Sequence, residues 1–464
     1  MTASKGDKGI ERREFLRYTG SGVLAGVGVM SSPLARYHKT LNKVDRKKLL
    51  AYPSLSLKER DWRWEKIRKL IRDHNVDALF IPAAGNSQSS SSIYFTNFPH
   101  PATVLFPADG EPIAFIPADG LTLDPFMRSE LDGQVSWIRD WRLGRGTGSD
   151  LVEILKAKQL TNAHIGTIGV FQGSKGGAGE PLLGKFLKDS LPQATFVELF
   201  DEFVPIWMVN SDEGLAMFRK AALALEDATE AFAAAAKPGA NLAEVGVAIL
   251  NTIVPYGLSI LGNFPFILYT GPEGGIGNEW LGRGLPPPVI KKGHIVQIFG
   301  LSCNCGHMEA QVQIAVSIGE PSKEIAQLGS IARKSYESGV KKIRPGVTFA
   351  EVSEAMFQPV KREGAWNLTP FIHSVNGNQP VSMRREGMWE NYTGLKERFP
   401  QSKMSSNVPI YGGDIVLQEG MTFVLEPNAS FGRKYVNIGG SVICTKDGCE
   451  ELNNRANRLI VVNV

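Results

Sequence analysis

Cysteine is scarce in this chain, which has only four among its 464 residues. Four cysteines are too few to build a disulfide scaffold for a protein of this length. The net charge is only +4 and no basic tract alternates with aromatic residues, so the sequence does not indicate nucleic-acid binding. The apolar stretch at residues 20–30 is too short and too rich in glycine to span a bilayer. We therefore expect a globular protein of two or three domains whose mature form has no membrane span.

The N-terminal segment has the features of an export signal. Arg12 and Arg13 precede the apolar stretch, which ends in small residues up to Ala35. This order resembles a twin-arginine signal, and the alternative is a disordered basic tail. We expect residues 1–35 to be the signal, followed by a linker over residues 36–55, and the mature protein to be periplasmic.

An oxidising compartment has a consequence for the cysteines. Cys444 and Cys449 are separated by four residues and could form a bridge there. Cys303 and Cys305 are separated by one residue and are poorly placed to bridge each other.

Hydrophobic periodicity predicts alternating helices and strands before residue 206. The expected helices are residues 57–74 and 151–158, and the expected strands are residues 77–82, 103–106, 113–116 and 164–170. Such alternation is typical of an α/β domain, which we place at residues 56–206. A long Ala-rich helix over residues 211–236 follows, capped by Asn210 or Ser211 and ended by a Pro-Gly pair.

Two blocks of the sequence occur twice. Residues 237–245 are echoed by residues 344–352, and residues 293–299 are echoed by residues 420–426. The second echo ends in Phe299 in one copy and in Glu426 in the other. The duplication predicts a pseudo-two-fold domain with a site between its halves, in which one half has lost an acid.

Together these blocks resemble the pita-bread family, which includes Xaa-Pro aminopeptidase, prolidase and creatinase. The resemblance also rests on residues 210–213, which open the Ala-rich helix, and on residues 76–80 and 93–98, which are similar to the N-terminal domain of creatinase and prolidase. It implies an α/β fold in which the creatinase/prolidase-type N-terminal domain precedes a pseudo-two-fold α+β pita-bread domain over residues 207–464. It also implies a homodimer.

The family's peptidases bind two divalent metal ions through two Asp, one His and two Glu, because hard oxygen ligands and one imidazole suit such a pair. The resemblance assigns these five positions, in order, to Phe299, Ala310, His373, Glu426 and Gly439. Only His373 and Glu426 keep a metal-ligating side chain. We therefore expect no metal and no other cofactor.

Neighbouring residues offer two ways around this loss. Glu309 is adjacent to Ala310, but neighbouring residues of a strand point to opposite faces. The segment with Cys303, Cys305, His307 and Glu309 could form a soft-metal site of its own. We favour a hairpin turn at Cys305-Gly306 over that site.

Creatinase is the closer comparison, because this branch keeps the histidine and the first glutamate and works without the metal pair. Its general-base histidine corresponds to Asn278 here, and an amide does not exchange protons near neutral pH. Glu279 and His307 are possible substitutes. We predict that His373 and Glu426 form an acid/base pair, and that Asn278 and Phe299 line the substrate site.

Other polar residues are candidates for the lining of the same cavity. Gln297, Gln311 and Gln313 could line a neutral polar pocket, but we favour outward-facing strand positions, since strands commonly alternate polar residues outward. The long connection over residues 381–410 is a candidate lid. Its Arg384, Arg385, Trp389 and Tyr392 could bind an anionic or aromatic ligand, or could instead form a dimer contact or surface loop.

Three functions follow from these residues. The leading one is a metal-independent hydrolase of the creatinase/Xaa-Pro peptidase type that cleaves a C–N bond in a small polar or peptide-like substrate. The alternative is a catalytically inactive module that binds a small molecule or short peptide in the old cleft. The third is a metallopeptidase with relocated metal ligands.

Overall fold

The computed structural model describes most of the chain after residue 52. The described residues are 53–83, 91–98, 100–117, 123–124, 126–128, 137–144, 148–158, 161–172, 179, 181–261, 268–275, 279–376, 381–382, 387–401 and 410–464. They all lie within one compact unit, residues 50–464. The proposed signal and linker, with Asn278, Arg384 and Arg385, lie outside the described residues, apart from linker residues 53–55. Within the described ranges, no helix has the length and apolar character needed to cross a bilayer.

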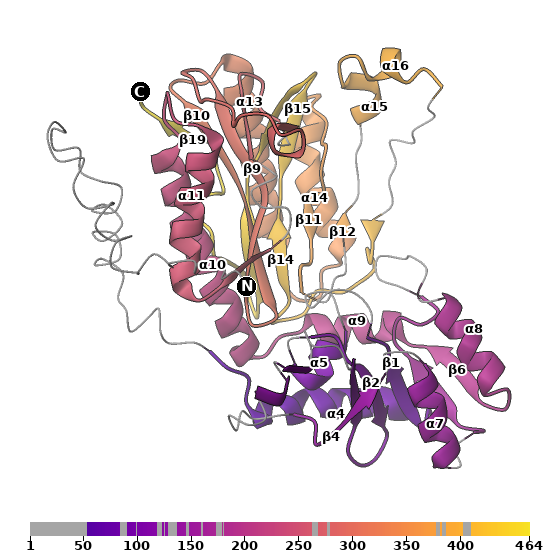
Figure 1. Cartoon of the computed structure of the whole chain (residues 1–464). Coiled ribbons are helices and arrows are strands. Elements are labelled where there is room, and N and C mark those ends of the chain that lie inside the picture. The colour runs from indigo at the N-terminus through magenta and orange to yellow at the C-terminus, as the bar shows by residue number, and fades with distance from the viewer. Residues whose placement is uncertain are drawn as a thin grey trace, which may run out of the picture. The chain divides into compact units, whose positions relative to one another are not determined.

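The first part of the unit is a six-stranded mixed sheet with helices, as the alternating pattern predicts (Figure 1). Strand β1 pairs antiparallel with β2 and parallel with β5. The spatial order is β4-β3-β2-β1-β5-β6, formed by β1 (Ala78–Ile81), β2 (Thr103–Pro107), β3 (Ile113–Pro117), β4 (Asp140–Gly144), β5 (His164–Thr167) and β6 (Thr195–Glu198). The helices are α4 (Leu57–Asp73), α5 (Ser92–Thr96), α7 (Ser149–Ala157), α8 (Pro181–Ser190) and α9 (Phe200–Met208).

The second part contains two sheets and a hairpin. One sheet comprises β7 (Ser259–Leu261), β8 (Leu268–Gly271), β9 (Ile295–Cys305), β10 (Met308–Ile318) and β19 (Ile460–Val462). The other comprises β11 (Ile372–His373), β12 (Val381–Ser382), β13 (Ile410–Tyr411), β14 (Thr422–Leu425), β17 (Gly440–Thr445) and β18 (Gly448–Glu451). The hairpin is β15 (Asn428–Phe431) with β16 (Lys434–Asn437).

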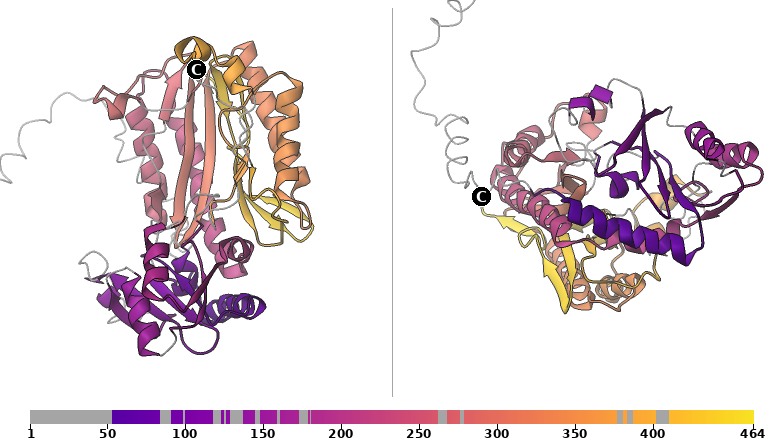
Figure 2. Two further views of the ribbon diagram at one scale, coloured as in Figure 1. Left: turned by 90° about the vertical axis from the view of Figure 1, so that its right-hand side faces the viewer. Right: turned by 90° about the horizontal axis from the view of Figure 1, so that it is seen from below.

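Two pairs of long helices flank these strands, as Figure 2 shows. The pairs are α10 (Asp212–Ala235) with α11 (Leu242–Ile253), and α13 (Lys323–Lys342) with α14 (Phe349–Arg362). Short helices at η2 (Val254–Tyr256), α12 (Glu279–Gly282), α15 (Met388–Asn391) and α16 (Leu395–Arg398) complete the described elements. The long Ala-rich helix begins as predicted, because the Ser211 side chain accepts a hydrogen bond from the Gly214 N–H.

The predicted duplication is present in the helix starts. Each half has a Pro-Gly turn followed by a helix with a capping box, in which a cap side chain and a glutamate three residues later bind each other's backbone N–H groups. The pairs are Asn241 with Glu244 before α11, and Thr348 with Glu351 before α14. The repeated block therefore encodes the same local structure in both halves.

The strand blocks repeat their hydrogen bonds too. The Gly293 N–H donates to the Ile318 carbonyl at 2.8 Å, and the Gly420 N–H donates to the Cys444 carbonyl at 2.9 Å. Gly293 and Gly420 are 127 positions apart and Ile318 and Cys444 are 126 apart, so these bonds are equivalent. By the same offsets, Phe299 corresponds to Glu426.

The pseudo-two-fold axis passes between two paired residues. Gln313 and Gly439 are 126 positions apart and thus equivalent, and they form an antiparallel bridge with each other. The Gln313 N–H donates to the Gly439 carbonyl at 3.0 Å. The two halves therefore meet at this bridge.

Arg63 of α4 connects the first part of the unit to the β9–β10 hairpin. Its guanidinium binds Glu59 at 2.7 Å, with both side chains almost fully buried, and lies over the rings of Tyr94 and Trp137. It also lies 3.4 Å from Nε2 of His307, which follows Gly306 in the hairpin turn. The predicted turn at Cys305-Gly306 is confirmed. Because His307 binds Arg63, it is not available as the substitute general base.

Since arginine only donates hydrogen bonds, Nε2 of His307 is the acceptor in this contact and the ring is neutral. Burial, together with the Arg63 charge, lowers the pKa of His307 from its ordinary 6.5 to about 3. Protonating the ring would place a second positive charge against Arg63, whose own charge is already paired with Glu59.

We predict that His307 makes the protein less stable in mild acid. The unfolded chain takes up a proton below pH 6.5 and the folded chain does not, so this contribution is lost as pH falls from 6.5 towards 3. In urea titrations between pH 6.5 and 4.5, the wild-type free energy of unfolding should fall by about 1 kcal/mol per pH unit more than that of His307→Gln. Glutamine still offers Arg63 an acceptor. Parallel pH profiles for the two proteins would contradict the prediction.

The duplication supplies a second test, because Gly293 and Gly420 have the same left-handed backbone, with φ of 82° and 86°. A Cβ at Gly293 meets nothing within 4 Å, whereas a Cβ at Gly420 would lie 2.6 Å from the Asn210 carbonyl oxygen. Gly293→Ala should cost about 1 kcal/mol for the backbone conformation alone. Gly420→Ala should cost about 2 kcal/mol or more beyond that, because Asn210 must move. Equal losses in chemical denaturation would show that the close approach is unimportant.

Candidate functional site

His373 and Glu426 are brought together by the pairing of β11 with β14. Ile372 pairs with Leu425 and His373 pairs with Val424. The Glu426 N–H then donates to the Phe371 carbonyl at 2.7 Å, which holds the residue after β14 against the residue before β11. Both side chains therefore start from neighbouring backbone positions.

The two side chains are in contact. Nε2 of His373 lies 3.3 Å from Oε2 of Glu426, and the side chains are 15% and 3% exposed. Nδ1 of His373 lies 3.2 Å from the Ser374 carbonyl oxygen. Each ring nitrogen thus faces an oxygen acceptor, and a neutral imidazole has only one N–H. The ring can donate to both oxygens only when each of its nitrogens carries a hydrogen.

Gln313 supports the Glu426 carboxylate. Its amide Nε2 donates to Oε2 of Glu426 at 3.1 Å, and its Oε1 accepts from the Gly300 N–H at 2.5 Å. Asn437 donates to the same Oε1 at 3.4 Å. A residue on the pseudo-two-fold axis therefore binds the surviving acid of one half and the backbone of the other.

The prediction that the strand glutamines face outward is wrong for two of them. Gln297 and Gln313 are buried, at 2% and 0% exposed. Gln297 accepts from the Asn437 N–H and donates to the Tyr435 carbonyl, because strand β16 packs where solvent was expected. Gln311 is half-buried and donates to Ser302 at 3.0 Å. The centre of the domain is a buried neutral amide network.

Two acceptor atoms in this network are left over. Oε1 of Glu426 and Oδ1 of Asn437 are buried and have no hydrogen-bond partner among the residues that the structure describes. Leaving a buried carboxylate oxygen unpaired is costly. The site therefore offers acceptors suited to a ligand N–H or a water molecule.

The residues present do not fit the family's pair of divalent metal ions. Ala310 is fully buried and has no donor atom, and Phe299 is half-buried in β9. At Gly439, where φ is 131°, a Cβ would lie 2.0 Å from the Leu425 carbonyl oxygen, so a glutamate side chain has no room. Throughout the described ranges, no group of three or more His, Cys, Asp or Glu is placed to hold a metal ion. The remaining donors are one imidazole and one carboxylate.

The soft-metal alternative near the hairpin lacks convergent ligands as well. The Cys303 thiol donates to the Ala221 carbonyl at 3.4 Å, and His307 binds Arg63. Glu309 lies opposite Asn304 in the register, one residue from Ala310, as the strand alternation predicts.

The other predicted site residues are placed less directly. Trp389 is half-buried in α15, and Tyr392, just after that helix, packs edge-on against Trp366 at 5.7 Å. Asn278 and Arg385 lie outside the described residues. No contact between Trp389 and the His373–Glu426 pair is seen.

The pseudo-symmetry reveals a counterpart of the His373–Glu426 pair, and the sequence alone did not predict this counterpart. Tyr269 pairs with Gln297 in the same way that His373 pairs with Val424. Tyr269 and Phe299 in one half therefore occupy the positions of His373 and Glu426 in the other. Extending the echoed blocks by the 126-residue offset would also have identified Gln313 as the equivalent of Gly439.

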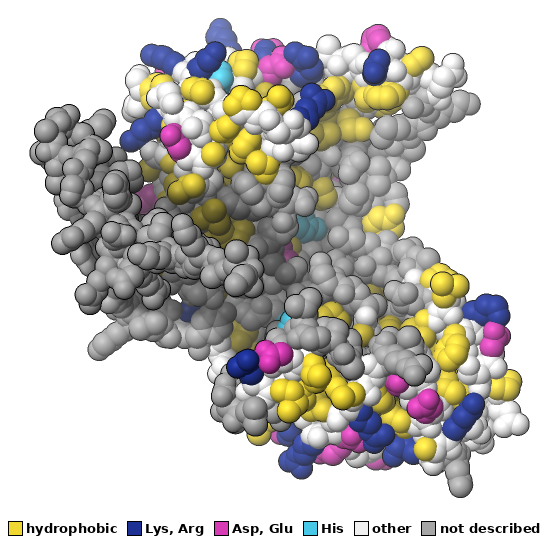
Figure 3. Space-filling model, viewed as in Figure 1, with side chains coloured by type: hydrophobic (Ala, Val, Ile, Leu, Met, Phe, Trp, Pro, Cys, Tyr) yellow, Lys and Arg dark blue, Asp and Glu magenta, His cyan; other side chains and the backbone are white. Residues whose placement is uncertain are grey.

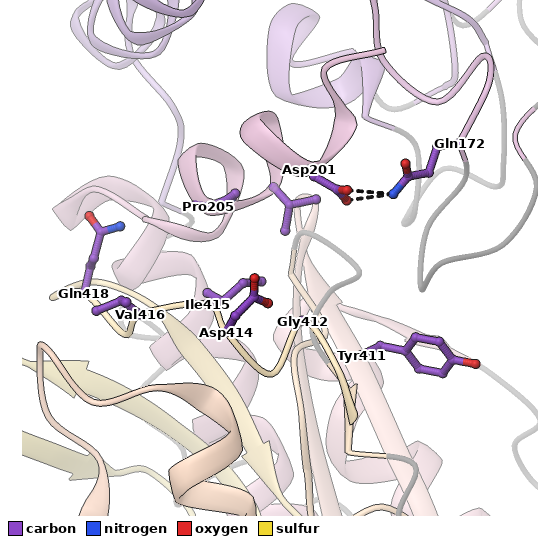
Figure 4. Close-up of a pocket in the computed structure, with 10 residues that line it drawn as sticks. Gln172, Asp201, Pro205, Tyr411, Gly412, Asp414, Ile415, Val416 and Gln418 are labelled. Carbon is purple, nitrogen blue, oxygen red and sulfur yellow. Dashed lines mark hydrogen bonds between the residues drawn. The ribbon is translucent and has the colours of Figure 1, made fainter. Parts of the chain in front are cut away.

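A separate cavity lies between α9 and residues 411–418 (Figure 4). Its volume is about 480 Å³, and the Gln172 amide donates to the Asp201 carboxylate at 2.8 Å on its wall. None of the predicted site residues that the structure describes lines it. On the face shown in Figure 3, Lys and Arg side chains of the described residues are interspersed with Asp and Glu.

The amino-acid sequence is similar to a known protein family. Residues 216–446 match the profile of metallopeptidase family M24. The probable dipeptidase PepE of Mycobacterium tuberculosis is 27% identical over 260 residues, and an uncharacterized peptidase of Staphylococcus aureus is 23% identical over 251 residues. The alignments cover 55% and 53% of this chain, and only 61% and 62% of those relatives.

Solved structures agree over a longer stretch. Dipeptidase PepE from Mycobacterium ulcerans has a TM-score of 0.63 at 20% identity, covering 88% of this chain and all of its own. The X-Pro aminopeptidase from Thermotoga maritima has a TM-score of 0.62 at 18% identity, covering 86% of this chain and 99% of its own. The prolidase from Pyrococcus furiosus has a TM-score of 0.59 at 17% identity, covering 83% and 99%. The chain thus has the pita-bread fold and carries a domain of metallopeptidase family M24.

Proposed function

We propose that this protein is a metal-independent hydrolase that cleaves a C–N bond in a small polar or peptide-like substrate. The observation that carries the proposal is the contact of 3.3 Å between Nε2 of His373 and Oε2 of Glu426. Similarity to proteins named dipeptidase and X-Pro aminopeptidase supports a peptide-like substrate. A buried acid and base in contact are the groups that proton transfer at a C–N bond requires.

The proposed chemistry uses only these two side chains and water. Water adds to the carbon of the C–N bond and gives one proton to the Glu426 carboxylate. The protonated His373 gives its proton to the leaving nitrogen, which departs as an amine. Glu426 then returns its proton to His373 across the 3.3 Å contact, and the pair is restored.

The surrounding network suits this role without a metal. Gln313 donates to Oε2 of Glu426, so the carboxylate keeps its position although the family's other acids are missing. Oε1 remains free to accept from substrate or water within the described part of the site. We further propose that Asn278, Phe299, Arg385 and Trp389 contribute to substrate binding.

Two further proposals concern the location of the protein and its oligomeric state. Export through the Arg12-Arg13 signal would place the mature protein in the periplasm. Assembly as a homodimer would agree with the family resemblance.

A second candidate is a binding module without turnover. The observation that favours it is the neutral amide network of Gln297, Gln313 and Asn437 around a single carboxylate. Unpaired buried acceptor atoms accept hydrogen bonds from the N–H groups of a ligand whether or not that ligand reacts.

We predict that metal neither occupies nor activates the purified mature protein. Elemental analysis should find less than one equivalent of manganese, cobalt or zinc, and adding these ions should not produce cleavage of Xaa-Pro dipeptides. The physical reason is that one imidazole and one carboxylate cannot offset the charge of two divalent ions. Two equivalents of metal with chelator-sensitive cleavage would instead support relocated ligands.

Removing either member of the pair should lower the turnover rate strongly. In a screen of small amides and dipeptides, we expect His373→Asn and Glu426→Gln to lower kcat by about 10²–10⁴-fold, since each removes a proton-transfer group. His294→Gln is the matched control, because His294 binds Thr270 on β8 and not Glu426. If the wild-type protein turns over no substrate but its melting temperature rises with a ligand, the binding module is favoured. Full activity in His373→Asn would refute the proposed mechanism.

A further inference from the structure

Two of the four cysteines lie directly opposite each other on neighbouring strands. Strands β17 and β18 form a hairpin in which Thr445 pairs with Gly448 and Cys444 pairs with Cys449. Only Lys446 and Asp447 lie between the closing pair. The side chains of directly opposed residues project from the same face of a sheet, so the two thiols are neighbours.

Whether a disulfide can join two opposed residues depends on whether they form a hydrogen-bonded or a non-hydrogen-bonded pair. Both backbone groups of Cys444 are directed away from β18: its N–H donates to the Met421 carbonyl at 2.8 Å, and its carbonyl accepts from the Gly420 N–H at 2.9 Å. Cys444 and Cys449 are therefore a non-hydrogen-bonded pair. In such pairs the Cα atoms are about 4.5 Å apart, which is within the range of about 4.4–6.8 Å that disulfides span.

The other two cysteines provide an internal contrast. Cys303 and Cys305 are two positions apart on β9, both fully buried. Residues i and i+2 of a strand are about 6.6–6.8 Å apart along the same face, near the upper limit for a disulfide, and their side chains run parallel to each other. The cross-strand pair is thus the better placed of the two.

We propose that Cys444 and Cys449 form a cross-strand disulfide that fastens β18 to β17. The oxidant is a disulfide, either a small molecule or a thiol oxidoreductase. The Cys449 thiolate attacks it, forms a mixed disulfide and releases one thiol. Cys444 then attacks the Cys449 sulfur and releases the second thiol, so that two electrons and two protons pass to the oxidant.

The order of attack follows from exposure. Cys449 is half-buried and Cys444 is fully buried, so an external disulfide reaches Cys449 first. Burial raises the pKa of the Cys444 thiol to about 11, and burial with the charge of Glu451 raises the pKa of Cys449 as well. Few molecules carry a thiolate at neutral pH, so the bond forms slowly and, once formed, exchanges slowly.

The position of β18 explains what the bond would do. β18 is the last strand of its sheet, and β17 separates it from β14, which leads directly to Glu426. Helix α13 packs on β18. An edge strand of four residues pairs on one side only, so a covalent tie to β17 opposes its fraying.

Trypsin provides a direct test, because Lys446 lies between the two cysteines. The full-length protein is incubated with oxidised glutathione, alkylated in denaturant without reductant, and digested. We expect the peptides covering residues 435–446 and 447–455 to remain linked and to separate on reduction, while Cys303 and Cys305 carry the alkyl label. Alkylated Cys444 and Cys449 on separate peptides, or glutathione retained on Cys449, would overturn the proposal.

The melting temperature tests whether the disulfide stabilises the protein by holding β18 on β17. Oxidised wild-type protein should melt about 2–4 °C above its reduced form, since the bond closes a short loop in a large chain. Cys449→Ser should show no redox-dependent shift, and Cys305→Ser should keep the wild-type shift. An unchanged melting temperature in wild-type protein that contains the linked peptide would refute the fastening role.

Discussion

The bridge between Gln313 and Gly439 is the constraint around which the second part of the molecule is organised. These two residues are equivalent in the duplicated halves, and they meet each other on the axis that relates the halves. A residue on such an axis must serve both sides with one side chain. Gln313 does this by accepting from the Gly300 N–H of one half and donating to Glu426 of the other. Its amide has both a donor group and an acceptor atom, whereas an ionised carboxylate has acceptor atoms alone.

The duplication makes the asymmetry of the site interpretable. Equivalent strand positions carry a histidine and a glutamate in one half, and Tyr269 and Phe299 in the other. The same backbone therefore presents a polar pair and an aromatic pair on opposite sides of the axis. Under the proposed function, such a site would distinguish the two ends of a small ligand, because one side would exchange protons and the other would offer apolar contact.

Local sequence signals predicted the fold well. The capped helices, the alternating strands and the hairpin turn at Gly306 follow from short-range chemistry, and the echoed Pro-Gly blocks revealed the internal symmetry. The family resemblance implied that His373 and Glu426 belong to one site, and the structure places them in contact. The burial of Gln297 and Gln313 did not, because their partners on Tyr435, Asn437 and Gly300 come from other strands. The contact between His307 and Arg63 joins residues 244 positions apart, and no periodicity could indicate it.

Gly439 restricts which side chains this point of the site can carry. Substituting a glutamate there would drive its Cβ to 2.0 Å from the Leu425 carbonyl oxygen, so the backbone as it stands has no room for that side chain. The backbone around Leu425 would have to move first, and that movement would disturb the bridge from Gly439 to Gln313. A larger residue at position 439 thus requires the backbone and the bridge to change together. The path of the backbone therefore closes this point of the amide-lined site to a glutamate, and a single substitution there does not supply a metal ligand.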